Sequence, residues 1–154
     1  MKLVSSDKLS IMYWGAISFT GRKILLKCPN RMNSRDYVNI LELVKDEFFQ
    51  DPETSFQDDN FPIHRSQLVN EWFRDNRVSR EEWPACSPDI NIIENVWGIM
   101  KNSLSKQYVR YENLDEKIME VWDSVNVENI KNLYNSIPRR IATCIQKNGG
   151  PVKY

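Results

Sequence analysis

The stretch that decides the predicted fold is Phe56–Gly98, FQDDNFPIHRSQLVNEWFRDNRVSREEWPACSPDINIIENVWG. It begins as a short apolar strand that stops at Asp58 and Asp59, and it ends in a helix whose first turn carries Glu94. A strand end and a helix start can each hold a carboxylate rigidly, and two carboxylates near one point suit a divalent metal ion. The stretch therefore predicts a metal site that uses one acid of the pair together with Glu94.

Size and charge limit the classes of protein that fit. A chain of 154 residues with 41% hydrophobic content is expected to form one globular domain. The 21 basic residues balance the 21 acidic ones, so contact with nucleic acid has to come from local patches rather than from a global field. After Glu128 the chain has no acid and five bases, Lys131, Arg139, Arg140, Lys147 and Lys153. This basic end either meets phosphate or is the solvated face of a terminal helix.

The cysteines and the N-terminal residues indicate the compartment. Cys28, Cys86 and Cys144 have no paired spacing and no histidine cluster, so neither a zinc site nor a disulfide framework is predicted. The apolar run near the N-terminus is too short and too interrupted for a signal peptide or a membrane span. We therefore expect a soluble, intracellular protein with no membrane contact, whose residues 1–10 lack regular structure.

Alternating strand and helix patterns predict the α/β class. Ile11–Ser18 and Lys23–Lys27 are expected to form a hairpin that turns at Gly21, and a helix capped by Asn33 should follow. The later elements are a short strand, further helices and one weakly patterned strand: a strand at about Ser55–Asp58, a helix at about Arg65–Asn76, a strand within Arg77–Trp83, a helix at about Ile92–Lys106 capped by Asp89 or Asn91, and helices at Leu114–Val125, Val127–Ser136 and Arg139–Asn148 with a break at Pro138. This order predicts a mixed sheet flanked by helices, with a helical C-terminal extension.

Several short sequence words together resemble the catalytic domain of Tc/mariner-type DNA transposases, which belong to the DDE superfamily and have an RNase H-like fold. The words follow the family's order and span nearly the whole chain: YWGAIS at Tyr13–Ser18, FQDDNFPIH at Phe56–His64, EWFRDN at Glu71–Asn76, WPACSPDINIIENVWGIMK at Trp83–Lys101, IPRRI at Ile137–Ile141 and NGGPVKY at Asn148–Tyr154.

The resemblance implies a chemistry and assigns residues to it. In the family three carboxylates hold two magnesium ions that serve DNA strand cleavage and transfer. The second aspartate falls on Asp59 and the third carboxylate on Glu94, so these two are the predicted catalytic and metal-binding residues. The resemblance also places His64 near the phosphate or the metal, although a lone histidine in such a loop is more often a hydrogen-bonding residue at a helix start.

Two departures from the family pattern shape the functional hypotheses. The family's first aspartate lies on a strand well upstream of the YWG strand, and here only twelve residues precede Tyr13, with Asp7 as their only acid. Helix-turn-helix modules are also missing. The resemblance therefore implies that residues 1–154 are a truncated catalytic domain with an incomplete RNase H-like fold.

Two functions stay open on these grounds. The first is a fragment of a transposase domain, inactive as this chain, whose family carries out magnesium-dependent DNA transposition and integration. The second is a domesticated, non-catalytic module that binds nucleic acid or protein. The resemblance further implies DNA as a partner, a possible homodimer and a nuclear location. The predicted DNA contacts are His64, Arg139, Arg140, Lys147 and Lys153.

Overall fold

The computed structural model describes residues 2–4, 10–83 and 87–150. The chain divides into two compact units. The hairpin unit consists of Met1–Cys28 and Pro88–Tyr154, and the inserted unit is Pro29–Ser87. Asp7, Cys86 and Lys153, which the sequence analysis singled out, lie outside the described residues.

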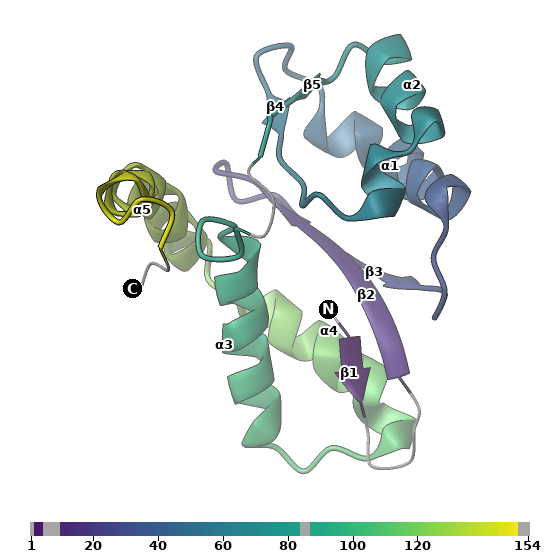
Figure 1. Cartoon of the computed structure of the whole chain (residues 1–154). Coiled ribbons are helices and arrows are strands. Elements are labelled where there is room, and N and C mark those ends of the chain that lie inside the picture. The colour runs from purple at the N-terminus through teal and green to yellow at the C-terminus, as the bar shows by residue number, and fades with distance from the viewer. Residues whose placement is uncertain (1, 5–9, 84–86, 151–154) are drawn as a thin grey trace. The chain divides into compact units, whose positions relative to one another are not determined.

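The hairpin unit contains a three-stranded antiparallel sheet (Figure 1). Its strands are β1 (Lys2–Val4), β2 (Ser10–Ile17) and β3 (Lys23–Cys28), in the order β1-β2-β3. The predicted hairpin is confirmed, because β2 pairs with β3 and Gly21 turns the chain with a φ of +90°. A non-glycine residue is strained at that φ, which explains the glycine in the turn.

The N-terminal segment contains a strand that the sequence analysis did not predict. We expected no regular structure in residues 1–10, and this is wrong for β1, which pairs with Ser10–Met12 of β2. Three residues are too short a window for a period to be read from the sequence. The neighbouring strand supplies the hydrogen-bonding partner that local sequence cannot reveal.

Three helices pack around this sheet and supply most of the core. They are α3 (Ile93–Ser105), α4 (Leu114–Ser124) and α5 (Val127–Gln146), with a short 3-10 turn, η2 (Tyr111–Asn113), before α4. The buried cluster joins residues from β2, β3 and all three helices: Ile11, Tyr13, Leu25, Val96, Trp97, Met100, Leu104, Ile118, Val121, Trp122, Val125 and Ile130. The buried faces of α3 and α4 therefore meet in one core.

Gly15 allows two tryptophans to pack closely on β2. The rings of Trp97 and Trp122 are stacked with centroids 5.6 Å apart. A Cβ atom at position 15 would lie 2.4 Å from the Trp97 ring and 3.3 Å from the Trp122 ring. The glycine of the YWG word is therefore explained by helix packing against the strand, because any larger residue would push α3 away.

Helix α5 corrects the predicted break at Pro138. The structure has one continuous helix over Val127–Gln146 with Pro138 inside it. A proline in a helix removes one backbone hydrogen bond and favours a kink or an end. Contacts on both sides hold this helix in place: Tyr134 Oη donates to the Ile17 carbonyl at 2.9 Å, and Arg140 is bonded to residues near α3.

The inserted unit contains two helices and a two-stranded parallel ladder. Helix α1 (Ser34–Phe48) begins at the predicted cap, because Asn33 Oδ1 accepts from the backbone of Asp36 and the Asp36 carboxylate accepts from the backbone of Asn33. The later elements are β4 (Ser55–Phe56), the 3-10 turn η1 (Pro62–Arg65), α2 (Gln67–Asp75) and β5 (Ser79–Arg80). The buried residues are Tyr37, Ile40, Leu41, Val44, Phe48, Val69, Trp72 and Phe73.

Two details of this stretch differ from the prediction. Strands β4 and β5 are only two residues long and pair in parallel with each other, so the parallel and antiparallel pairings belong to separate sheets within the described residues. Helix α3 begins at the residue after Ile92, and within the described chain no side chain caps it, although Asp89 or Asn91 was expected to do so. The cap prediction failed because the side chain of the actual N-cap residue has no acceptor atom.

Candidate functional site

Two consecutive aspartates after β4 have opposite environments. The side chain of Asp58 is 6% exposed, whereas that of Asp59 is 61% exposed. Neighbouring residues in an extended segment point to opposite sides of the backbone, which explains how adjacent acids separate in this way. The Asp-Asp pair therefore supplies one buried carboxylate and one carboxylate that is open to solvent.

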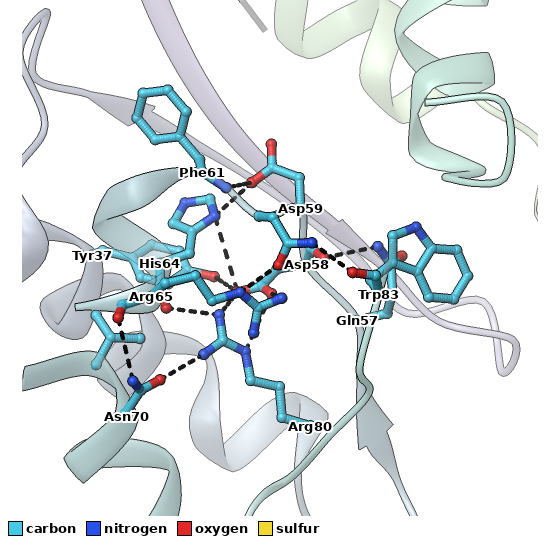
Figure 2. A network of polar contacts seen from close by, with 12 residues as sticks. Tyr37, Gln57, Asp58, Asp59, Phe61, His64, Arg65, Asn70, Arg80 and Trp83 are labelled. Atoms are coloured by element: carbon cyan, nitrogen blue, oxygen red, sulfur yellow. Dashed lines mark hydrogen bonds and ion pairs between the residues drawn. The ribbon is translucent and has the colours of Figure 1, made fainter. Parts of the chain in front are cut away.

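Asp58 is held by a buried network of polar side chains (Figure 2). Arg80 Nη2 donates to its Oδ2 at 2.6 Å, and Tyr37 Oη donates to the same oxygen at 3.0 Å. Arg65 Nη2 lies 3.4 Å from Oδ1. Burial, and then the charge of Asp58, raises the pKa of Tyr37 well above its usual value. Asp58 therefore contacts two arginines and the neutral hydroxyl of Tyr37. Because these contacts fix its carboxylate, Asp58 anchors the loop.

Arg80 is a structural residue that the sequence analysis missed. It joins β5 to the loop, because its guanidinium also donates to the His64 carbonyl at 2.7 Å and to Asn70 Oδ1 at 3.1 Å. Its guanidinium also lies over the Phe73 ring at 4.7 Å. The segment around Arg80 was recognised only as a weak strand, so nothing in its pattern pointed to a buried ion pair.

Asp59 has few partners and stays ionised. His64 Nδ1 lies 2.7 Å from its Oδ1, and the backbone N–H of Phe61 donates to the same oxygen at 3.1 Å. The contact with His64 is the main reason why the pKa of Asp59 is lowered, and it outweighs the opposing effect of partial burial. Both contacts are made to Oδ1. Neither of these two contacts uses Oδ2, so the exposed, charged carboxylate can offer this oxygen to a ligand.

His64 is fixed by both neighbouring rings and by its backbone. Its ring stacks on Tyr37 with centroids 4.1 Å apart and meets the exposed Phe61 ring edge-on at 5.9 Å. Its backbone N–H donates to the Phe61 carbonyl at 2.9 Å, within the turn that precedes α2. This backbone bond does not depend on the side chain, so the interpretation of His64 as a hydrogen-bonding residue at a helix start stays a prediction, and the ring lies against Asp59. A role beside a metal or a phosphate stays a prediction.

Glu94 occupies the predicted position in the first turn of α3. Its side chain is exposed, and its backbone N–H donates to the Asn91 carbonyl at 3.1 Å. One turn later, Gly98 has open space at the position that a Cβ would take. Glu94 belongs to the hairpin unit and Asp59 to the inserted unit. That the two carboxylates share a metal ion therefore stays a prediction.

The predicted basic contacts divide into exposed and buried residues. Arg139 and Lys147 are exposed on or just after α5, whereas Arg140 is 3% exposed. Both interpretations of Arg140 given above, a phosphate contact and a solvated face, are wrong, because its guanidinium is bonded inside the hairpin unit. A charge pattern alone cannot distinguish these two neighbours.

Comparisons with known proteins decide the family. A family model described as DDE superfamily endonuclease matches residues 4–118. The chain belongs to this family. Within the DDE superfamily it is a Tc1/mariner transposase catalytic domain, which confirms the resemblance found in the sequence.

The similar proteins agree on family and fold. The Tc3 transposase of Caenorhabditis elegans is 32% identical over 151 residues, which cover 94% of this chain and 46% of that protein. The chain thus spans about half the length of the curated relatives it matches. A structure of the Mos1 transposase catalytic domain with raltegravir and Mg has a TM-score of 0.84 at 19% identity and covers 99% of this chain and 82% of that one. The Mos1 strand transfer complex has a TM-score of 0.82 at 19% identity and covers 97% and 46%. The RNase H-like transposase fold, with a helical C-terminus, is therefore confirmed.

The donor atoms of this transposase domain can be tested against the magnesium ions that the family implies. Asp59 and Glu94 both present exposed carboxylates, and carboxylate oxygen is the ligand that magnesium prefers. Among the residues that the structure describes, no group of three or more His, Cys, Asp or Glu side chains is arranged to hold a metal. Cys28 and Cys144 are thiols. The oxygen donors of Asp59 and of Glu94, each taken within its own unit, are of the type that a hard ion binds.

The helices of the domain also bear on the membrane question. In the described part of the chain, none combines the length and the apolar character that a bilayer span requires.

Proposed function

We propose that this domain contributes Asp59 and Glu94 to a magnesium site for DNA strand cleavage and transfer. The observation that carries the proposal is the difference between the two aspartates. The Asp58 carboxylate accepts hydrogen bonds from Arg80 and Tyr37, whereas Asp59 is exposed, ionised and in contact with His64. A carboxyl group that binds a metal ion has to be deprotonated and accessible, and neighbouring groups fix its orientation. Asp59 meets these three requirements.

Each residue of the proposed site has a defined task. Asp59 and Glu94 supply oxygen ligands, and His64 orients the Asp59 carboxylate through its Nδ1 atom. When bound, magnesium ions activate the attacking oxygen and stabilise the leaving oxygen of a displacement at phosphorus. The Mos1 structures with Mg and in a strand transfer complex support magnesium and DNA as the ligands to test.

The matched pair is proposed to be insufficient for cleavage. The family resemblance requires three carboxylates, and two of them match positions in this sequence. Two acids can hold one ion weakly, but phosphoryl transfer by two metals requires both ions to be placed at the same time. We therefore expect the 154-residue chain to hold a divalent ion weakly and not to nick DNA.

A plasmid-nicking assay tests this function. It compares the 154-residue chain, a chain extended upstream to include an acid-bearing strand, and the extended chain with Glu94→Gln or with Asp59→Asn, each with magnesium or manganese. The proposal expects nicking only from the extended chain, and loss of nicking with Glu94→Gln. Nicking by the extended chain that survives both Glu94→Gln and Asp59→Asn contradicts the assignment of the site.

The second candidate function is a DNA-binding module without cleavage activity. The exposed Arg139 and Lys147, in a C-terminal stretch that contains no acid after Glu128, favour it. Phosphate contacts of this kind give weak binding without sequence preference. Anisotropy titrations with labelled duplex DNA test it, and the same samples in analytical ultracentrifugation test whether two copies associate. A nuclear location is part of this proposal and is checked by imaging a tagged chain.

A further inference from the structure

Arg140 is a buried cation on α5 that is bonded to residues around the start of α3. Its Nη1 donates to the Asp89 carbonyl at 3.0 Å and to Asn95 Oδ1 at 2.9 Å. Its Nε donates to Ser136 Oγ at 2.7 Å, one turn earlier on the same helix. With contacts on two nitrogens the planar guanidinium has a fixed orientation.

The two acceptors of Nη1 lie on either side of Glu94 in the sequence. Asp89 lies in the turn that leads into α3, and Asn95 is the residue directly after Glu94. One guanidinium nitrogen therefore links the approach to α3 with its first turn. All of these residues belong to the hairpin unit.

Within the described residues, the start of α3 has no side-chain cap. The N-cap residue, Ile92, has no side-chain acceptor, and in the described chain no side chain caps the helix. The N–H groups of Glu94 and Asn95 donate to the Asn91 and Ile92 carbonyls, each at 3.1 Å. A first turn without a side-chain cap is less stable than a capped one, and this turn carries the Glu94 carboxylate.

We propose that Arg140 is a positioning residue for Glu94: it fixes the first turn of α3 so that the Glu94 carboxylate is held ready for a divalent cation. The inference rests on the proposed function, in which Glu94 is a metal ligand. In this role Arg140 acts through the start of α3 and is not itself a ligand of the ion. Residues that support metal ligands through hydrogen bonds change metal affinity or activity by about 10- to 100-fold when they are replaced.

Arg140→Lys separates geometry from charge. Lysine keeps the positive charge, but a single ammonium cannot reproduce a planar group that bonds Asp89, Asn95 and Ser136 through two nitrogens. If only a buried positive charge were required, Arg140→Lys would behave like the original chain. Arg139→Lys is the matched control, because it makes the same exchange at the adjacent, exposed position.

The test measures manganese binding at Glu94 by NMR, without any need for activity. The 15N-labelled 154-residue chain is titrated with Mn²⁺, and the concentration that half-broadens the Glu94 amide signal is recorded. We expect Arg140→Lys to raise this concentration about tenfold and Arg139→Lys to leave it unchanged. An unchanged concentration in a folded Arg140→Lys chain overturns the inference.

Asn95→Ala keeps the test decisive if Arg140→Lys does not fold. It removes one acceptor of Nη1 and leaves Arg140 in place, and we expect it to raise the half-broadening concentration severalfold. If Asn95→Ala leaves that concentration unchanged, the inference fails. Urea unfolding of each variant shows whether the chain is folded during the titration.

Glu94→Gln distinguishes failure of the inference from failure of the proposed function. If Glu94→Gln does not weaken the broadening at position 94, Glu94 is not a metal ligand and the proposed function itself fails. If Glu94→Gln weakens the broadening whereas Arg140→Lys and Asn95→Ala do not, only the positioning role of Arg140 is wrong.

Discussion

Two pairs of like-charged neighbours, Asp58-Asp59 in the inserted unit and Arg139-Arg140 in the hairpin unit, divide in the same way. In each pair one side chain is buried and hydrogen-bonded within its own unit, and the other is exposed. Asp58 anchors a loop and Arg140 holds a helix start. The exposed members, Asp59 and Arg139, are the ones that can meet a ligand. Adjacent charges of the same sign therefore serve different purposes, and burial distinguishes them.

The largest expected effect is a difference in the free energy of unfolding between variants of Asp58 and of Asp59. Removing one partner of a buried ion pair costs about 3–5 kcal/mol, because the other charge stays buried without compensation. Asp58→Ala leaves Arg80, which is 10% exposed, in that position. We expect the free energy of unfolding, measured in urea, to fall by this amount for Asp58→Ala and by less than about 0.5 kcal/mol for Asp59→Ala. Equal losses in the two variants would remove the distinction.

For Arg139 and Arg140 we expect a smaller difference in the free energy of unfolding, again with the larger loss at the buried residue. Arg140→Ala leaves the Asp89 carbonyl and the Asn95 side chain without their donor, and a hydrogen bond to a charged group contributes about 1.5–3 kcal/mol. Arg139→Ala should change the free energy of unfolding by no more than about 0.5 kcal/mol. Thermal and urea denaturation of both variants measure the difference. A loss for Arg139→Ala as large as that for Arg140→Ala would contradict it.

In DNA binding we expect the exposed Arg139 to contribute more than the buried Arg140, which is the reverse of their order in stability. Each phosphate that a protein neutralises contributes about 0.9 to the slope of log K against log salt concentration. We expect Arg139→Gln to lower this slope by about that amount, and Arg140→Gln, at the buried position, to leave the slope of the folded chain unchanged. Anisotropy titrations with duplex DNA at four salt concentrations give the slopes. A slope that falls for Arg140→Gln and not for Arg139→Gln would contradict this assignment of the DNA contact.

The smallest expected effect is a change in the pKa of Asp59. The contact with His64 lowers this pKa below the usual 3.8, so His64→Ala should raise it towards that value. A lowered carboxyl pKa stabilises the folded state above the unfolded pKa, and this contribution is lost as the pH falls through the folded value. This contribution is therefore fully present at neutral pH, and its change with pH lies in the acid range. A 13C NMR titration of the Asp59 carboxyl measures it, and a pKa that stays put or falls in His64→Ala would refute the role of His64.

Periodic features of the fold were predictable from the sequence. The apolar stripe of α1, its Asn33 cap and the hairpin turn at Gly21 follow from helical spacing, capping chemistry and turn chemistry, which act over a few residues. The strand β1 and the continuity of α5 through Pro138 were missed. Both depend on contacts with residues distant in the chain, on the β2 edge and near α3, which no local pattern contains.

The candidate site was predictable only in part. The sequence words assigned Asp59 and Glu94, and the structure gives both the exposure that a ligand requires. The buried partners Arg80 and Arg140 were not recognised in these roles, because an arginine in a polar segment looks the same whether it is solvated or buried. Their acceptors include main-chain carbonyls, which every residue has, so sequence composition carries no signal for such contacts.

The central claim, that Asp59 and Glu94 bind one divalent ion together, is tested most directly by manganese broadening across the two units. The Asp59→Asn chain is titrated with Mn²⁺ while the Glu94 amide is observed, and the Glu94→Gln chain is titrated while the Asp59 amide is observed. If the carboxylates share an ion, each substitution weakens the broadening at the other residue. Broadening at Glu94 that is unchanged by Asp59→Asn, together with broadening at Asp59 unchanged by Glu94→Gln, would show two independent sites and contradict the claim.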